Sequence, residues 1–183
     1  MTQPDVYDVA CLAGGPARVV DTALVSLLVT GRVRAVAPGE LQVVDTTRRH
    51  PVEAAVLDAV GGRGRRSVGT VRWRALADDR VTRLSRRLRE ERLVGRFSRR
   101  TAAGRLVLER ARAADVGPVL HAALDGREQL GDPELRAALA EPPARPVLPG
   151  SGISPWVLSW GDGCDVARRT RDSLVTRGSD GRP

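Results

Sequence analysis

Apolar residues between positions 19 and 28 recur every three or four residues, which is helical spacing. Pro16 suits the first turn of a helix and Gly31 suits the residue just beyond its end, so the pattern predicts one long helix between them. The preceding pair, Gly14 and Gly15, predicts a sharp turn between a first short helix and this long one.

A β-hairpin is predicted next, because strand-like residues 32–36 and 41–45 flank a turn at residues 37–40. A further helix is predicted over residues 50–62, where Pro51 stands near the start and apolar side chains follow at helical spacing. Helix, hairpin and helix in this order form the outline of a winged-helix unit.

The second half of the chain repeats this outline. Residues 78–97 have apolar side chains at helical spacing, with Asp78 or Asp79 as the N-cap, and run into a short strand. Thr101 is the predicted N-cap of the following helix, and two shorter helices follow it before the chain becomes rich in proline. We predict a second, smaller winged-helix-like unit whose wing is degenerate.

The predicted fold class is therefore mainly α with short β-hairpins, in two tandem winged-helix-like units over residues 5–62 and 67–140. The low aromatic content of 3% agrees with this, because large sheets usually use more aromatic residues. Residues 141–152 are rich in proline and glycine and predict a linker. Residues 153–183 then form a tail.

The tail contains two of the three tryptophans, Trp156 and Trp160, four positions apart. A short segment cannot bury such side chains alone, so they need another surface. We predict that the tail docks onto a partner. Cys164, within the segment GDGCD, is a candidate residue at that interface.

Charge changes the picture of the middle of the chain. The 183 residues have a net charge of +8, and all 30 basic residues are arginine. Residues 61–112 hold 17 arginines and five acidic residues, a local net charge of +12. This suits a nucleic acid, an acidic protein or a membrane surface as a partner, and a solvated helix face accounts for the same composition.

One predicted helix in this segment has an arginine-rich face. Val81, Leu84 and Leu88 are predicted to face the core, which leaves the arginines exposed. The candidate partner-binding residues on this face are Arg80, Arg83, Arg86 and Arg87. A DNA-recognition helix can have the same pattern, although such helices usually include asparagine, glutamine or lysine as well.

Residue spacing excludes several kinds of site. The AGGP segment at 13–16 lacks the lysine and the third glycine of phosphate-binding loops, and its proline removes a backbone N–H. Cys11 and Cys164 lie far apart, and the only histidines are His50 and His121, which gives neither metal-ligand spacing nor a catalytic pair. We expect no cofactor, no metal and no enzyme activity in this chain.

The N-terminal segment has no charged and apolar leader, and the longest apolar run, ALVSLLV, has seven residues. A membrane-spanning helix needs about 20. We therefore expect a cytoplasmic protein that does not cross a membrane.

Four segments carry a family resemblance: YDVACLAGGPARVVDTALVSLLVTGRVRAV, HPVEAAVLDAV, RTAAGRLVLERARA and LGDPELRAALA. Together, over residues 7–140, they resemble a largely uncharacterised family of actinobacterial proteins, known mainly as a conserved domain of membrane proteins. Members usually carry an apolar membrane hairpin between the equivalents of Leu93 and Thr101, and many end in a tail rich in glycine and cysteine. This chain has neither and resembles a soluble variant.

The resemblance implies a partner protein, because the family has no established enzymatic activity. Its genes are often near those of multinuclear iron oxidases that modify cysteine-containing peptides. Such oxidases commonly work with a small protein that presents the peptide, often through a winged-helix-like recognition unit.

Together these observations suggest a non-catalytic adaptor that binds a peptide, an enzyme or both. Its context would be an iron-dependent peptide-modifying oxidase of ribosomal peptide natural-product biosynthesis. The wing strands of the first unit, including Val43, would accept an extended peptide by strand addition, and the arginine face would take an acidic leader or partner. The alternative is a winged-helix DNA-binding transcriptional regulator.

Overall fold

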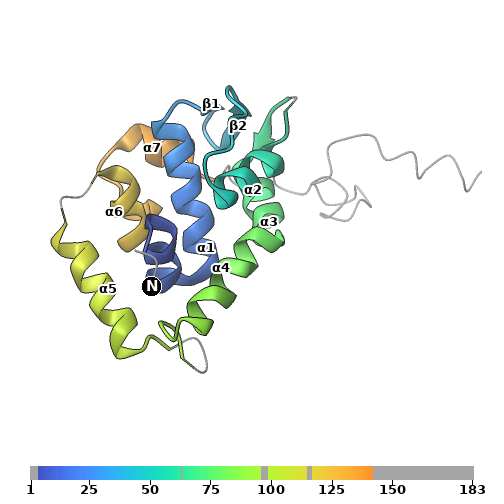
Figure 1. The fold of residues 1–183 in the computed structure, drawn as a ribbon. Helices are drawn as coiled ribbons and strands as arrows, with labels where there is room; N and C mark the ends of the chain where they lie inside the picture. The colour runs from blue at the N-terminus through green and yellow to red at the C-terminus, as the bar shows by residue number, and fades with distance from the viewer. Residues whose placement is uncertain (1–3, 63, 96–98, 115–116, 142–183) are drawn as a thin grey trace, which may run out of the picture. The chain divides into compact units, whose positions relative to one another are not determined.

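A computed structural model describes residues 4–62, 64–95, 99–114 and 117–141 of the chain (Figure 1). These residues belong to one compact unit, Met1–Pro143. The second unit, Ala144–Pro183, lies outside the described residues, and so do most of the predicted linker and the whole predicted tail with Trp156, Trp160 and Cys164.

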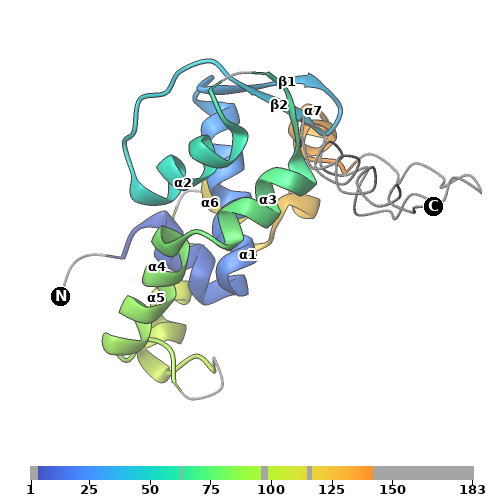
Figure 2. The same ribbon diagram turned by 90° about the vertical axis from the view of Figure 1, so that its right-hand side faces the viewer.

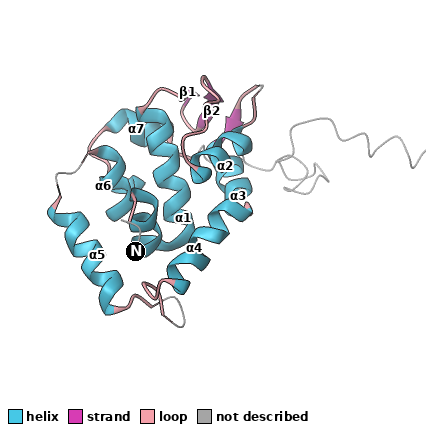
Figure 3. Ribbon diagram, in the orientation of Figure 1, coloured by secondary structure: helices cyan, strands magenta, loops and turns pink. Residues whose placement is uncertain are grey.

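The described part is mainly helical with a small antiparallel sheet, as predicted (Figure 3). The elements in chain order are α1 (Val6–Val29), β1 (Val33–Ala37), β2 (Glu40–Val43), α2 (Pro51–Val60), β3 (Arg66–Ser67), α3 (Val68–Leu76), α4 (Asp79–Glu90), α5 (Ala102–Ala113), α6 (Pro118–Leu124), the 3₁₀ turn η2 (Arg127–Gln129) and α7 (Pro133–Ala138).

Helix α1 begins at a capping box. The Asp5 carboxylate accepts the backbone N–H groups of Tyr7 and Asp8, and the Asp8 carboxylate accepts the N–H of Asp5 in return. The helix then breaks at Gly15, whose φ of 73° and ψ of −166° are accessible in practice only to glycine. Pro16 follows at once. The predicted short helix, sharp turn and long helix are confirmed.

The end of α1 sets the direction of the hairpin. Gly31 has a φ of 68°, and its N–H donates to the carbonyl of Leu28. The next residue, Arg32, donates to the carbonyl of Leu27, which completes a Schellman motif. The chain leaves the helix in a fixed direction and enters β1 at once.

The predicted hairpin is confirmed as the antiparallel pair β1 and β2. Val33 lies opposite Val43 and Ala35 opposite Leu41, and the register shifts between Ala35 and Ala37. β3 pairs with the start of β2, so the strand order is β1-β2-β3 and β1 is an edge strand. Within the described ranges, no strand pairs with the outer side of β1.

Side-chain caps start all the α-helices that follow except α6, whose N-cap is Gly117. The predicted N-caps Asp78 of α4 and Thr101 of α5 are confirmed, and Asp132 caps α7 in the same way. At α2 the cap is His50, whose Nδ1 accepts the N–H of Val52. His50 therefore sits at the helix start as a structural residue, as its position before Pro51 indicates.

Helix α3 and strand β3 form where the hydrophobic pattern predicts no element. Arginines and glycines interrupt the apolar positions of this segment. The signals that identify α3 are weak: Ser67 caps it, and Val68, Val71 and Ala75 are its buried face at helical spacing.

Helix α1 is the centre of the packing. It contacts α6 most extensively, and α2, α3, α4 and α5 also pack against it. In both ribbon views the hairpin lies at the C-terminal end of α1, and the α4–α5 connection lies at the other end (Figures 1 and 2). Since its neighbours come from residues 51–60 and from residues 68–124, α1 belongs to the core of both predicted units.

The connection from α4 to α5 is tied to the break in α1. Val94 and Arg100 form an isolated antiparallel bridge. The Arg100 guanidinium donates to the carbonyls of Leu12 and Ala13, both at 2.6 Å, just before the break at Gly15. The helix end at the break is therefore capped from a distant part of the chain.

By length and composition alone, α1 could cross a membrane: an 18-residue window has a mean hydropathy of 1.4. Half of that window is buried inside the protein, and the core helix of a soluble protein meets the same criteria. The helix also contains two buried carboxylates, Asp8 and Asp21.

Candidate functional site

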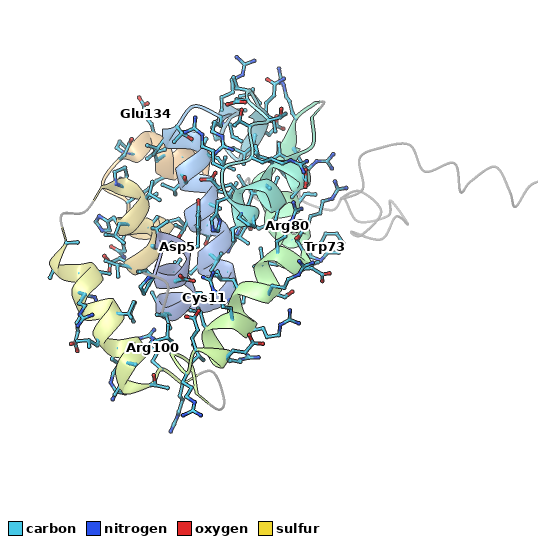
Figure 4. The ribbon with its side chains drawn as sticks, in the orientation of Figure 1. Asp5, Cys11, Trp73, Arg80, Arg100 and Glu134 are labelled. Atoms are coloured by element: carbon cyan, nitrogen blue, oxygen red, sulfur yellow. The ribbon has the colours of Figure 1, made fainter. Side chains whose placement is uncertain are left out.

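An open groove of about 340 Å³ lies between the first turn of α2 and the exposed face of α4; we call it the arginine groove. It is lined by His50, Pro51, Val52, Arg80, Arg83, Leu84, Arg86, Arg87 and Glu90. All four arginines predicted as partner contacts line it, so the structure brings them together. Figure 4 labels Arg80, at the start of α4.

The orientation of α4 follows from its apolar stripe. Val81 and Leu88 are fully buried and Leu84 is nearly so, which confirms the predicted core face. The helix therefore turns its arginines toward solvent and toward the start of α2, against which it packs.

Arg80 is the most strongly paired arginine of the groove. Its guanidinium donates to both carboxylate oxygens of Asp78 and also to Asp58 at 2.8 Å. Asp58 lies on α2 and also binds Arg48. Arg80 therefore links the two walls of the groove and has few donors left for a ligand.

Arg87 also has a carboxylate partner within the protein. It forms an ion pair with Asp8, whose side chain is almost completely buried in α1. Burial raises the pKa of Asp8, and the positive charge of Arg87 opposes that effect. Arg87 is half-exposed, but its main contact fixes α4 against the start of α1.

Arg83 and Arg86 are different. Their side chains are 63% and 70% exposed, and each lies 3.8 Å from one exposed carboxylate on α4, Asp79 or Glu90. Within the described residues, neither makes a hydrogen bond of normal length. Exposed pairs at this distance contribute little stability, about 0.5 kcal/mol or less. These two guanidinium groups are the available anion-binding groups of the groove.

The opposite wall is held by His50. Its ring stacks on Tyr7 with centroids 4.4 Å apart, and its Nε2 lies 3.2 Å from an Asp5 carboxylate oxygen. Its Nδ1 accepts from Val52, so Nε2 carries the proton in the neutral ring. The positive end of the α2 dipole also lies at this wall.

A buried polar cluster, which the sequence pattern does not reveal, supports the same wall. Glu53, on α2, accepts hydrogen bonds from Tyr7 at 2.7 Å and Ser26 at 2.9 Å, and it pairs with the buried Arg32. Burial raises the pKa of Glu53, but the three donors together outweigh burial and hold that pKa below its usual range. The cluster joins α2 to both ends of α1.

The remaining predicted contacts lie elsewhere. Val43 is on β2, partly buried against the core, and does not line the groove. Trp156, Trp160 and Cys164 lie outside the described residues. The third tryptophan, Trp73, which the sequence pattern does not single out, is 63% exposed on α3, on the same side of the molecule as Arg80 (Figure 4).

Two kinds of chemical group complete the description of these residues: metal ligands and the thiol of Cys11. Over the described ranges, no group of three or more His, Cys, Asp or Glu side chains is arranged to hold a metal ion. Cys11 is buried with its Sγ 3.5 Å from the Ser85 hydroxyl, and burial raises the pKa of its thiol, which makes it a poor nucleophile.

Compared with known proteins, the chain matches no family model, no curated protein and no solved structure. The geometry of the arginine groove and the sequence itself are therefore the grounds for a functional proposal.

Proposed function

We propose that the protein is a non-catalytic adaptor that binds a peptide, an enzyme or both through the arginine groove. The observation that carries this proposal is the pair Arg83 and Arg86, exposed at the groove with only loose carboxylate contacts. Because little internal pairing is lost, these guanidinium groups can turn to the carboxylates of a partner at low cost.

The sheet supplies a second contact surface in this proposal. β1 is an edge strand, and an extended peptide can add to such an edge through backbone hydrogen bonds. Val43 stays a candidate here as part of β2, the strand beside β1, rather than as part of the groove.

The proposed context comes from the family resemblance: a cytoplasmic partner of a multinuclear iron oxidase that modifies a cysteine-containing peptide. Two tandem winged-helix-like units remain part of the proposal. The order α1-β1-β2-α2 supports the first unit, and the bridge between α4 and α5 supports a degenerate wing in the second. The tail with Trp156, Trp160 and Cys164 would dock onto the oxidase.

A DNA-binding transcriptional regulator is the second candidate. The same exposed face of α4 favours it, because arginines without strong internal partners also bind phosphates. In that case binding would depend steeply on salt, since each neutralised phosphate releases counterions.

One experiment separates the two candidates. The tagged full chain is expressed in an actinobacterial host, and bound proteins and peptides are identified by mass spectrometry. The double variant Arg83→Gln/Arg86→Gln is compared with a matched control, Arg110→Gln/Arg112→Gln, which removes the same charge from the exposed side of α5. An adaptor retains an iron oxidase or its peptide in the native and control proteins and loses it in the groove variant.

A regulator gives a different result. Duplex DNA then binds the native and control proteins at low salt, and the groove variant binds it weakly. Recovery of the same iron oxidase with the groove variant as with the native chain would rule out the groove as its binding site.

A further inference from the structure

The arginine groove is not lined by charge alone. Pro51 is exposed at the first position of α2, and the almost completely buried Val52 and Leu84 form the floor beside it. The aliphatic stems of Arg83 and Arg86 add further apolar surface, since arginine side chains cover apolar surface with their stems. At about 340 Å³ the groove is at the small end of ligand sites and suits a few side chains.

Carboxylates of the protein surround the groove. Glu90 lines it, Asp79 lies 3.8 Å from Arg83, and Asp58 pairs with Arg80 at one wall. A continuous phosphate backbone that crossed the groove would meet these negative charges as well as the arginines. A short segment with two separate carboxylates places negative charge only at Arg83 and Arg86, whose own carboxylate contacts, Asp79 and Glu90, are loose.

We infer that the groove binds a short acidic peptide segment in which carboxylates flank an apolar side chain. Arg83 and Arg86 each bind a carboxylate, and the apolar side chain lies on Pro51 and on the stems of these two arginines. Arg80 and Arg87 stay paired with Asp58, Asp78 and Asp8 and fix α4 against α2 and α1. This inference rests on the proposed adaptor function and specifies the chemistry of its ligand.

Pairs of exposed arginines suit this ligand for a geometric reason. Arg83 and Arg86 are three residues apart on a helix, so their side chains leave the same face as neighbours. A planar guanidinium forms two parallel hydrogen bonds with one carboxylate, which makes such contacts specific in direction. The apolar contact then distinguishes this segment from a uniformly acidic one.

The test uses the full chain and a fluorescein-labelled 12-residue peptide of repeated Glu-Leu-Glu-Ser, measured by fluorescence anisotropy. In two comparison peptides, serine replaces leucine or arginine replaces glutamate. We expect the first peptide to bind, and both comparison peptides to bind at least about tenfold more weakly. Arg83→Gln/Arg86→Gln should weaken binding of the first peptide roughly tenfold or more, and Arg110→Gln/Arg112→Gln by less than about twofold.

Thermal melts of both double variants show whether either one is misfolded. Equal weakening of peptide binding by the two double variants would overturn the inference, because binding would then depend on the net charge of the protein and not on Arg83 and Arg86. Equal binding of the leucine and serine peptides would also overturn it, and so would displacement of the peptide by random duplex DNA at lower concentration than by unlabelled peptide. If no peptide binds but the groove variant still loses its oxidase partner, the ligand chemistry is wrong and the adaptor function stands.

Discussion

The four arginines of the groove have the same side chain and different surroundings. Arg80 and Arg87 contact carboxylates that the fold itself holds, whereas Arg83 and Arg86 extend into solvent. Helical spacing identifies which side of α4 is exposed. It does not identify Asp8 as the partner of Arg87, because the two residues are far apart in the sequence and meet only when α4 packs on α1.

Charge reversal separates these two kinds of arginine. Arg83→Glu should change the free energy of unfolding by less than about 0.5 kcal/mol, as exposed substitutions usually do. Arg87→Glu should lower it by roughly 1 to 3 kcal/mol, because the buried Asp8 loses its partner and faces a like charge. Urea unfolding of both variants at one pH measures the difference. Equal stabilities would mean that the Asp8 pair contributes nothing to folding.

Glu53 makes stability depend on pH. Its pKa in the folded protein is lowered, so the carboxylate stabilises the fold fully above the pKa of the unfolded chain, about 4.3. That stabilisation is lost as the pH falls through the lower pKa of the folded state. Glu53→Gln should cost about 3 to 5 kcal/mol at pH 7, because Arg32 is left buried without its counter-charge.

The same variant should lose less stability than the native protein between pH 5 and pH 3, since it lacks a carboxylate whose pKa is lowered by folding. Glu109→Gln, at an exposed position of α5, is the control and should follow the native protein at all three pH values. The measurement is urea unfolding at pH 7, 5 and 3. An unchanged pH profile in Glu53→Gln would contradict the role of this carboxylate.

At the scale of elements, the sequence predicts those features that depend on residues close together in the chain. The caps Asp78 and Thr101, the break near Gly15 and the hairpin are confirmed because each depends on a few neighbouring residues. Helix α3 is different. Its apolar face has only three buried residues, and it is helical because that face packs on α1 and α2, a contact that no local pattern contains.

The approach of α5 to the rest of the fold depends on one glycine. A Cβ atom at Gly104 would lie 2.3 Å from the Leu93 carbonyl oxygen, which is backbone and cannot turn away. Gly104→Ala should therefore lower the free energy of unfolding by about 1 to 3 kcal/mol, in spite of the better helix propensity of alanine.

Gly131→Ala is the matched control for this prediction. Nothing lies within 4 Å of the Cβ it would add, so its stability should stay close to that of the native protein. Thermal melts of the two variants give the comparison. A Gly104→Ala protein as stable as the Gly131→Ala protein would show that α5 does not pack closely on Leu93.

At the scale of the molecule, the arginine groove forms because both of its walls, α2 and α4, pack against α1. α2 ends at Val60 and α4 begins at Asp79, and each packs on α1 as well as on the other. The arginine face of α4 is therefore predictable from spacing, and the groove is not, because its second wall comes from the first turn of another helix.

The hydrophobic core of the described residues is formed by side chains of the first unit, Met1–Pro143. Its buried apolar side chains run from Tyr7 to Leu139, and Glu141 joins Arg72 and Arg127 near the end of that range. A chain that ends at Gly150 should therefore fold on its own and melt cooperatively. Its melting temperature should lie within about 2 °C of that of the full chain, which means a difference of less than about 1 kcal/mol in the free energy of unfolding. Thermal unfolding followed by circular dichroism tests this, and a broad or much lower transition would mean that residues 151–183 complete the core.

The shortened chain also separates two roles of the molecule. If the arginine groove alone binds the acidic segment, the labelled Glu-Leu-Glu-Ser peptide binds the shortened and full chains equally. If Trp156 and Trp160 dock onto the oxidase, the shortened chain loses affinity for the oxidase while it keeps affinity for the peptide, because tryptophan side chains supply much of the binding energy at protein interfaces. Equal affinity for the oxidase in both chains would refute docking of the tail.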